Sequence, residues 1–202
     1  MIFSDRIRLR ALERSDIPRF VAWFNDPEVI AGLPRVYPVS QADEEIWFDA
    51  MLKRPEAEHP MMIEVRVAGE RPPQAVSFPP GVMPLDVDWV PIGNCGFHAI
   101  DWRNRSVELG IAIGEKRFWN QGYGSEAMRL LVKFGFETLN LHRIWLRVLA
   151  NNLRAIHSYE KVGFVHEGRM REAEFKNGSY ADTLLMSILE SERNYAPASH
   201  TP

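Results

Sequence analysis

A short loop with two glycines, followed by a helix, is the first segment whose residues could do chemistry. The loop reads Trp119-Asn120-Gln121-Gly122-Tyr123-Gly124-Ser125. After it, apolar residues recur at Ala127, Leu130, Leu131 and Phe134, the spacing of one helix face. The first backbone N–H groups of a helix have no intrahelical partner and lie at the positive end of its dipole, so they can bind a phosphate. Because glycine also serves simply to turn the chain, this loop alone is weak evidence, and it matches neither the dinucleotide fingerprint nor the lysine-containing nucleotide loop.

The segment before this loop carries an acid among very small residues. Residues 107–113 alternate, so that Val107, Leu109, Ile111 and Ile113 share one strand face. The other face presents Glu108, Gly110 and Ala112. Two interpretations are open: room for a ligand beside the backbone, or a strand packed under an element that demands small residues, with Glu108 paired to an arginine such as Arg105.

A tyrosine lies on the inner side of a short helix further along the chain. The helix is predicted over Leu153 to Val162, with Asn152 as its cap and Gly163 at its end. Tyr159 either fills the core or acts as a proton donor. A phenol with a pKa of about 10 keeps its proton at pH 7 and can give it to a leaving group.

The elements that must position these residues form a strand-helix-strand unit. A strand over 107–114, a helix from about 124 to 140 and a strand over Arg143–Leu149 should place the two strands parallel. The anion site would then lie at the carboxyl end of the first strand. Further expected elements are a half-buried strand over 7–10, helices over 17–25 and 41–53, strands over 61–67 and 92–101, and a hairpin of 171–175 with 180–189 around Asn177-Gly178.

Residues 70–91 contain six prolines and are predicted to be a long irregular insertion. Three interpretations are open: a tolerated surface insertion, a cover for a substrate cleft, or a self-association segment that would make the protein a homodimer. The rest of 1–192 is predicted to be a single domain, and 193–202 a tail.

Composition excludes several classes of protein. The chain has 202 residues, with 24 Lys and Arg against 27 Asp and Glu, a net charge of -3 that argues against a nucleic-acid partner. Its one cysteine, Cys95, excludes a cysteine-rich zinc site, so no metal is predicted. Cys95 is expected in the core rather than as a nucleophile. No apolar run has the roughly 18 to 20 residues that span a bilayer, and the N-terminal residues are charged, so we expect no membrane partner and a cytoplasmic location.

Two motifs together carry a resemblance to a known family. The loop Trp119 to Ala127, followed by Asn152-Leu153-Arg154-Ala155-Ile156-His157-Ser158-Tyr159-Glu160-Lys161-Val162-Gly163-Phe164, resembles the GNAT superfamily of acetyl-CoA-dependent N-acetyltransferases. The similarity is to the branch of ribosomal-protein N-terminal and spermidine acetyltransferases, over about 7–188 with a gap at the proline-rich insertion. Trp119 departs from the Gln or Arg that usually opens the family loop. The resemblance implies an α/β (α+β) GNAT fold, with a mixed central sheet of about seven strands, a splayed parallel pair and about four flanking helices.

The resemblance also implies an activity and a set of site residues. The protein would transfer an acetyl group from acetyl-CoA directly to a primary amine, either a small amine or polyamine or a protein N-terminus. Glu108 would be the base and Tyr159 the acid of this reaction. The cofactor would contact Ile111, Ala112, Ile113, Trp119, Asn120, Gln121, Gly122, Tyr123, Gly124, Ser125, Asn152 and Ala155. On the acceptor side the resemblance implies Trp23, Asp26 and Glu28, and the acids at 43–45 either attract a cationic acceptor or only cap a helix. The alternative is a module that binds acyl-CoA without turnover.

Overall fold

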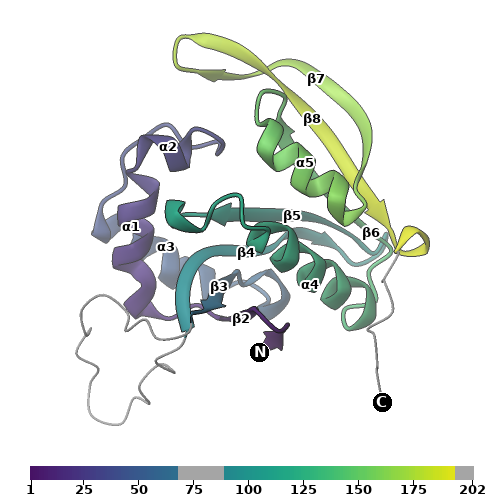
Figure 1. Ribbon diagram of the computed structural model, residues 1–202, viewed down its shortest axis with the longest axis horizontal. Coiled ribbons are helices and arrows are strands. Elements are labelled where there is room, and N and C mark those ends of the chain that lie inside the picture. The colour runs from purple at the N-terminus through teal and green to yellow at the C-terminus, as the bar shows by residue number, and fades with distance from the viewer. Residues whose placement is uncertain (68–88, 194–202) are drawn as a thin grey trace.

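One mixed sheet forms the centre of the computed structural model, which describes residues 1–67 and 89–193 (Figure 1). Within these residues the sheet has eight strands in the order β1-β2-β3-β4-β5-β6-β8-β7. The strands are β1 (Ile2–Phe3), β2 (Ile7–Ala11), β3 (Met61–Arg66), β4 (Trp89–Asp101), β5 (Ser106–Ile113), β6 (Arg143–Leu149), β7 (Val165–Lys176) and β8 (Ser179–Leu189). Only β5 and β6 are parallel neighbours in this sheet. The eighth strand, beyond the seven expected, is the two-residue β1 at the edge.

Helices cover both faces of the sheet (Figure 1). In the described ranges they are α1 (Ile17–Phe24), α2 (Pro27–Ile30), α3 (Gln41–Met51), α4 (Tyr123–Glu137) and α5 (Leu153–Val162). Helices α4 and α5 pack against one face with Leu109 and Leu146, and α1 and α3 pack against the other with Met62. The predicted strand-helix-strand unit is confirmed as β5-α4-β6. The helix beyond the expected four is α2, a single turn that starts at Pro27 and is capped by Asp26.

Capping contacts confirm the predicted starts of α3 and α5 and the predicted end of α5. Ser40 and Asp43 form a capping box at the start of α3. The Asn152 side chain accepts from the Ala155 amide at the start of α5, and Gly163 ends that helix with a left-handed φ of 109°. The hairpin turn at Asn177-Gly178 has the two positive φ angles, 51° and 79°, that such a turn requires.

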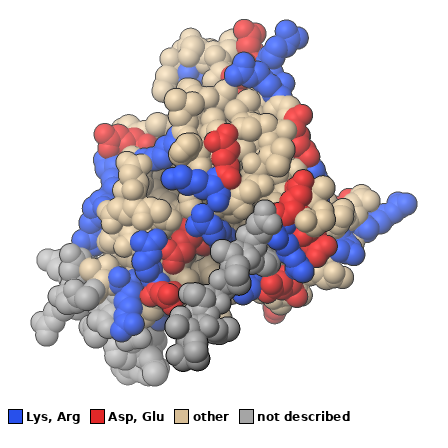
Figure 2. All heavy atoms as spheres, turned by 45° about the vertical axis from the view of Figure 1, so that its right-hand side comes forward, with Lys and Arg blue, Asp and Glu red and all other residues tan. Residues whose placement is uncertain are grey.

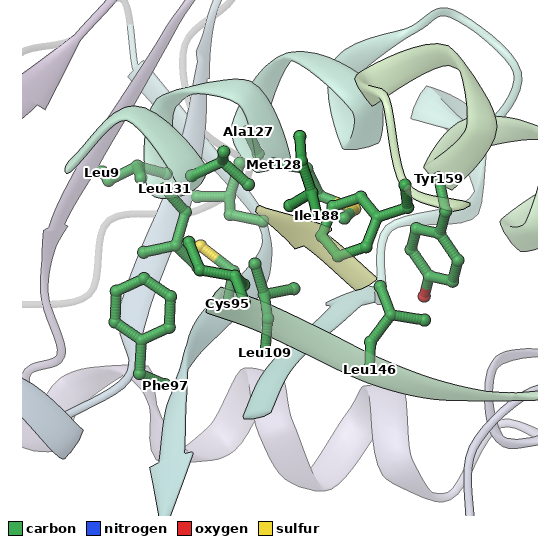
Figure 3. Close-up of a cluster of buried hydrophobic side chains, with 14 of the residues drawn as sticks. Leu9, Cys95, Phe97, Leu109, Ala127, Met128, Leu131, Leu146, Tyr159 and Ile188 are labelled. Carbon is green, nitrogen blue, oxygen red and sulfur yellow. The ribbon is translucent and has the colours of Figure 1, made fainter. Parts of the chain in front are cut away.

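The core between α4, α5 and the sheet contains the only cysteine (Figure 3). Cys95 on β4 is 1% exposed and lies among Leu109, Leu131 and Phe97. Burial raises the pKa of its thiol to about 12. The thiolate is therefore disfavoured, and Cys95 is a core residue, as expected.

Strand β2 differs from its prediction as a half-buried strand, because both of its faces are covered. Arg8 and Arg10 are each only 8% exposed. Arg8 Nε lies 2.6 Å and Arg10 Nε 2.8 Å from the two carboxylate oxygens of Glu64, which is fully buried on β3. Arg10 also makes two bonds, of 2.7 and 2.8 Å, to Asp16. The arginines of β2 thus form a buried ionic network with Glu64 and Asp16, on the sheet face against which α1 and α3 pack.

Two strand boundaries were wrong in the sequence-based prediction. Strand β4 begins at Trp89, so Pro91 lies inside a strand rather than in the insertion; this proline pairs with Glu64 where a bulge interrupts the ladder between β3 and β4. Strand β7 begins at Val165 instead of Arg171, and its bulges break the two-residue periodicity that would have shown it. Residues 70–88 of the predicted insertion and 194–202 of the tail lie outside the described residues. Within the described ranges, no helix combines the length and apolar character that crossing a bilayer requires.

Candidate active site

The parallel strands β5 and β6 separate after three residue pairs. Their pairing extends from Ser106 with Arg143 to Glu108 with Trp145. Strand β5 nevertheless continues to Ile113, and β6 to Leu149. On its β6 side, the stretch from Gly110 to Ile113 therefore has no strand partner within the described chain. Such an edge offers main-chain N–H and C=O groups to an extended ligand.

A cavity of about 630 Å³ opens at this separation. The cavity is lined by β5, by the loop before α4 and the first turn of α4, by α5, by the loop after α2 and by the β7-β8 hairpin. The hairpin reaches toward the side where α2 lies (Figure 1), and Lys176 Nζ near its tip donates to the carbonyls of Ile30 and Leu33. Elements that are far apart in the sequence thus line a single cavity.

Most of the predicted site residues line this cavity. Glu108 and Tyr159 do, and so do Ile111, Ala112, Ile113, Trp119, Asn120, Gly122, Tyr123, Gly124, Ser125, Asn152 and Ala155. Gln121 does not line it, and its side chain donates to the carbonyl of Arg117 at 2.6 Å.

The start of α4 presents unpaired main-chain amides to the cavity. Asn120 and Gly122 turn the loop through left-handed φ angles of 61° and 85°. Intrahelical bonding starts with the amide of Glu126, which donates to Gly122 O at 3.0 Å. The amides of Tyr123, Gly124 and Ser125 precede it and have no helical partner. A side-chain-free backbone and three free donors make this turn suited to a phosphate.

Trp119 and Arg154 connect this loop to β5 and α5. The indole Nε1 of Trp119 donates to the carbonyl of Ile113 at 2.8 Å, at the end of the unpaired edge. The Arg154 guanidinium carbon lies 3.7 Å from the centre of the Trp119 ring, and desolvation lowers the pKa of Arg154. Arg154 belongs to the second family motif but is not among the predicted site residues. Its position in the first turn of a helix that directly follows a strand is the sequence feature from which this cation could have been predicted.

Glu108 is held by an arginine of the opposite strand. Arg147 Nε lies 2.8 Å from Glu108 Oε1, so the partner is Arg147 on β6 and not Arg105. His98 on β4 lies directly across from Glu108 in the ladder. Desolvation lowers the pKa of His98 more than the negative charge of Glu108 raises it. A Cβ at Gly110 would lie 2.7 Å from His98 Nε2, which explains the small residue beside the acid.

The side chain of Tyr159 extends from α5 toward the sheet, and its hydroxyl lies on the side of Leu146 (Figure 3). The residue is 9% exposed, and its ring packs 6.1 Å from that of Phe164. Burial raises the pKa of Tyr159 to about 12. No described residue hydrogen-bonds to this hydroxyl, although the residue lines the cavity. The phenol thus remains protonated and available to a ligand.

The predicted acceptor-side residues lie outside the cavity lining. Trp23 is 7% exposed and packs against Gly114, where a Cβ would come within 2.1 Å of its ring. Asp26 and Glu28 bind Lys116 at 2.8 and 2.6 Å, and the pKa of Asp26 is lowered mainly by its hydrogen bond with Lys116.

The acids at the start of α3 differ from one another in their surroundings. Asp43 belongs to the capping box, and Gln41 donates to Glu45. Glu44 is 2% exposed and accepts from Arg35 at 3.3 Å. Of this pair, only Arg35 lines the cavity.

Comparison with known proteins identifies one family. Residues 6–165 match the family described as the acetyltransferase (GNAT) domain. An uncharacterized N-acetyltransferase, p20 of Bacillus licheniformis, is 30% identical over 193 residues, which cover 95% of this chain and 97% of that protein. The spermidine N(1)-acetyltransferase of Vibrio cholerae is 38% identical over 93 residues, 46% of this chain and 53% of that protein.

A solved structure extends the similarity over nearly the whole chain. The crystal structure of a Vibrio cholerae spermidine N-acetyltransferase in complex with CoA and spermine superposes with a TM-score of 0.77 at 27% identity. The match covers 94% of this chain and 98% of that one. The described part of this chain contains no cluster of three or more His, Cys, Asp or Glu side chains able to hold a metal ion.

Proposed function

The chain belongs to the GNAT family of acetyltransferases, and on that premise we propose that it transfers the acetyl group of acetyl-CoA directly to a primary amine. One observation carries this proposal. An unpaired strand edge, a turn of free amides and a buried phenol face the same cavity.

The residues around the cavity fit coenzyme A. The amides of Tyr123 to Ser125 would bind its diphosphate, and the edge at Ile111–Ile113 would pair with its pantetheine arm. Arg154 adds a cation beside the loop, and Asn152 and Ala155 border the same space. When bound, acetyl-CoA supplies the acetyl group as a thioester.

Two side chains would move the protons of the reaction. An amine with a pKa of about 10.4 is mostly protonated at pH 7, so it must lose a proton before it attacks. We assign this proton to Glu108, directly or through water, because its carboxylate lies in the cavity and Arg147 fixes its orientation. We assign protonation of the departing sulfur to the Tyr159 hydroxyl. The acceptor role of Trp23, Asp26 and Glu28 stays a prediction, because these residues contact Gly114 and Lys116, which do not line the cavity either.

The decisive experiment follows free thiol during incubation with acetyl-CoA and a panel of amines and peptides. We expect thiol release in proportion to acetylated product with at least one acceptor. Coenzyme A binding without thiol release across the whole panel would instead identify a non-catalytic acyl-CoA-binding module.

A pair of glycine substitutions tests the amide turn. Gly122 and Gly178 both have positive φ, 85° and 79°, and a Cβ would have space at each. Alanine at either position should destabilise the fold similarly, by about 1 kcal/mol, because of backbone strain. Only Gly122→Ala should weaken coenzyme A binding, about tenfold in Kd by calorimetry, because it displaces the amides of α4. Equal coenzyme A affinities of the two variants would contradict the assignment.

Other expectations concern location and partners. Basic and acidic side chains are interspersed on the face drawn in Figure 2, which with the net charge of -3 supports the prediction that nucleic acid is not a partner. The cytoplasmic location and the homodimer stay predictions.

A further inference from the structure

An acid lies in the first turn of α4, immediately after the three residues whose amides we assign to the diphosphate. This acid is Glu126, and its own amide makes the first intrahelical hydrogen bond. A carboxylate in this position stabilises the helix, because it lies near the positive end of the helix dipole. The same negative charge repels a diphosphate bound at that end. An anion site here therefore requires that the charge of Glu126 be neutralised.

The turn between β1 and β2 supplies the partners of this carboxylate. Ser4 Oγ donates to Glu126 Oε1 at 2.5 Å. Arg6 donates to Glu126 Oε2 through Nε at 2.9 Å and through Nη2 at 2.5 Å. Each carboxylate oxygen thus has a donor, and a guanidinium balances its charge. The Glu126 side chain is 19% exposed, and that of Arg6 is 51% exposed.

Arg6 also contacts the residues of 121–123, which form the turn that leads into α4. Its guanidinium carbon lies 4.8 Å from the centre of the Tyr123 ring. Its Nη1 lies 3.5 Å from the carbonyl oxygen of Gln121, and a Cβ at Gly122 would lie 3.7 Å from its Nη2. One side chain therefore reaches three consecutive residues of this turn in addition to Glu126.

Hydrogen bonds fix the main chain from which Arg6 extends. The Ser4 amide donates to the carbonyl of Ile7 at 2.9 Å, which closes the turn between β1 and β2. The Arg66 amide donates to the carbonyl of Arg6 at 2.9 Å, which joins this turn to the end of β3. The sheet thus holds the guanidinium beside the start of α4.

Stability alone does not account for these contacts. An ion pair with a half-exposed arginine contributes little to the free energy of unfolding, because water and salt screen it. Arg6 is also not among the residues that line the cavity. Its influence on a bound anion would therefore pass through Glu126 and the turn, and not through direct contact.

We infer that Arg6 is a positioning residue for coenzyme A: by pairing with Glu126, it prevents the charge of this acid from opposing the diphosphate at the start of α4. Ser4 assists by holding the second carboxylate oxygen. The inference rests on the proposed function and adds to its cofactor site a residue of the N-terminal strands.

Removal of the guanidinium tests this role. In Arg6→Met the Kd for coenzyme A, measured by calorimetry, should rise about tenfold, and the rise should be smaller at high salt because salt screens the charge of Glu126. Arg14→Met is the matched control. Arg14 has a 53% exposed side chain, lies 2.5 Å from the Asp49 carboxylate and has its guanidinium carbon 5.0 Å from the centre of the Phe48 ring. Arg14→Met should change Tm by a similar small amount and keep this Kd within about twofold.

A double substitution separates the charge of Glu126 from the packing of Arg6. Arg6→Met combined with Glu126→Gln should restore the coenzyme A Kd to within about threefold of the unsubstituted value, because no unpaired carboxylate is left. Glu126→Gln alone should bind coenzyme A at least as tightly as the unsubstituted protein. Arg6→Lys keeps the charge without the forked geometry and should lose less affinity than Arg6→Met. A merely structural role would give no recovery, since the double variant loses more contacts than Arg6→Met.

A thioester without phosphate groups provides a second readout. S-acetylpantetheine lacks the diphosphate, so its kcat/KM should agree within about twofold between Arg6→Met and the unsubstituted protein. The kcat/KM for acetyl-CoA should fall about tenfold in the same variant.

Three results would overturn the inference: equal coenzyme A affinities of Arg6→Met and Arg14→Met, no recovery in the double variant, or an equal fall in kcat/KM for both thioesters. Failure of the unsubstituted protein to bind coenzyme A, or to release thiol with any amine, would instead overturn the proposed function. The failures of the two proposals are therefore distinguishable.

Discussion

Replacement of Tyr159 by phenylalanine should lower kcat by about 10²- to 10⁴-fold and leave the affinity for acetyl-CoA nearly unchanged. The substitution removes one oxygen from a ring that packs against Phe164 and keeps the ring itself. Because no described residue bonds to the hydroxyl, its loss leaves no protein group without a partner. The effect should therefore fall on the chemical step, through the missing proton donor. Steady-state kinetics together with coenzyme A titration measure both quantities.

Tyr180 provides the matched control for this substitution. It is 65% exposed on the β7-β8 hairpin and packs 5.0 Å from Phe175. Tyr180→Phe should keep kcat within about twofold, since surface substitutions away from special contacts have small effects. An unaltered kcat in Tyr159→Phe would remove Tyr159 from the mechanism.

The pH profile provides a second test of the same residue. With a pKa of about 12, the Tyr159 hydroxyl stays protonated at pH values well above the ordinary tyrosine pKa of about 10. If Tyr159 is the acid, kcat should rise as the amine loses its proton and should not fall between pH 9 and about 10.5. A falling limb in this range that disappears in Tyr159→Phe would show that the phenol titrates there, contrary to its burial.

The helix ends and the phosphate turn could be predicted because local chemistry determines them. Asn152 caps α5 and Gly163 terminates it through contacts within a few residues, and the glycines of 119–125 require no distant partner. The same holds for the β5-α4-β6 unit, whose periodicities are unambiguous. Most of the predicted cofactor residues consequently line one cavity.

The features that could not be predicted depend on residues distant in sequence. Nothing near Glu108 indicates that Arg147, 39 positions away, is its partner. Thr183 resembles any strand threonine until the register places it beside the separation of β5 and β6. The charges of β2 were misinterpreted for the same reason, because an alternating pattern does not show whether helices cover the second face of a strand.

The buried network of β2 leads to the largest expected effect on stability. Glu64→Ala should lower the free energy of unfolding by about 3 to 5 kcal/mol, because removal of one partner leaves buried charge uncompensated. Arg10 would keep its two bonds to Asp16, but among the described residues Arg8 would retain only the face of Trp89, 4.7 Å from its guanidinium carbon. The loss is thus expected to arise mainly from Arg8. Urea unfolding followed by circular dichroism measures it.

Asp49 provides the control for burial, because it makes the same kind of ion pair at the surface. Its carboxylate lies 2.5 Å from Arg14, and both side chains are more than half exposed. Asp49→Ala should change the free energy of unfolding by less than about 1 kcal/mol, since water replaces the lost partner. Double substitution of Arg8→Met with Glu64→Ala should recover part of the stability lost in Glu64→Ala, because it removes the charge left without a partner. Equal losses for Glu64→Ala and Asp49→Ala, or no recovery in the double variant, would show that uncompensated buried charge is not the cause.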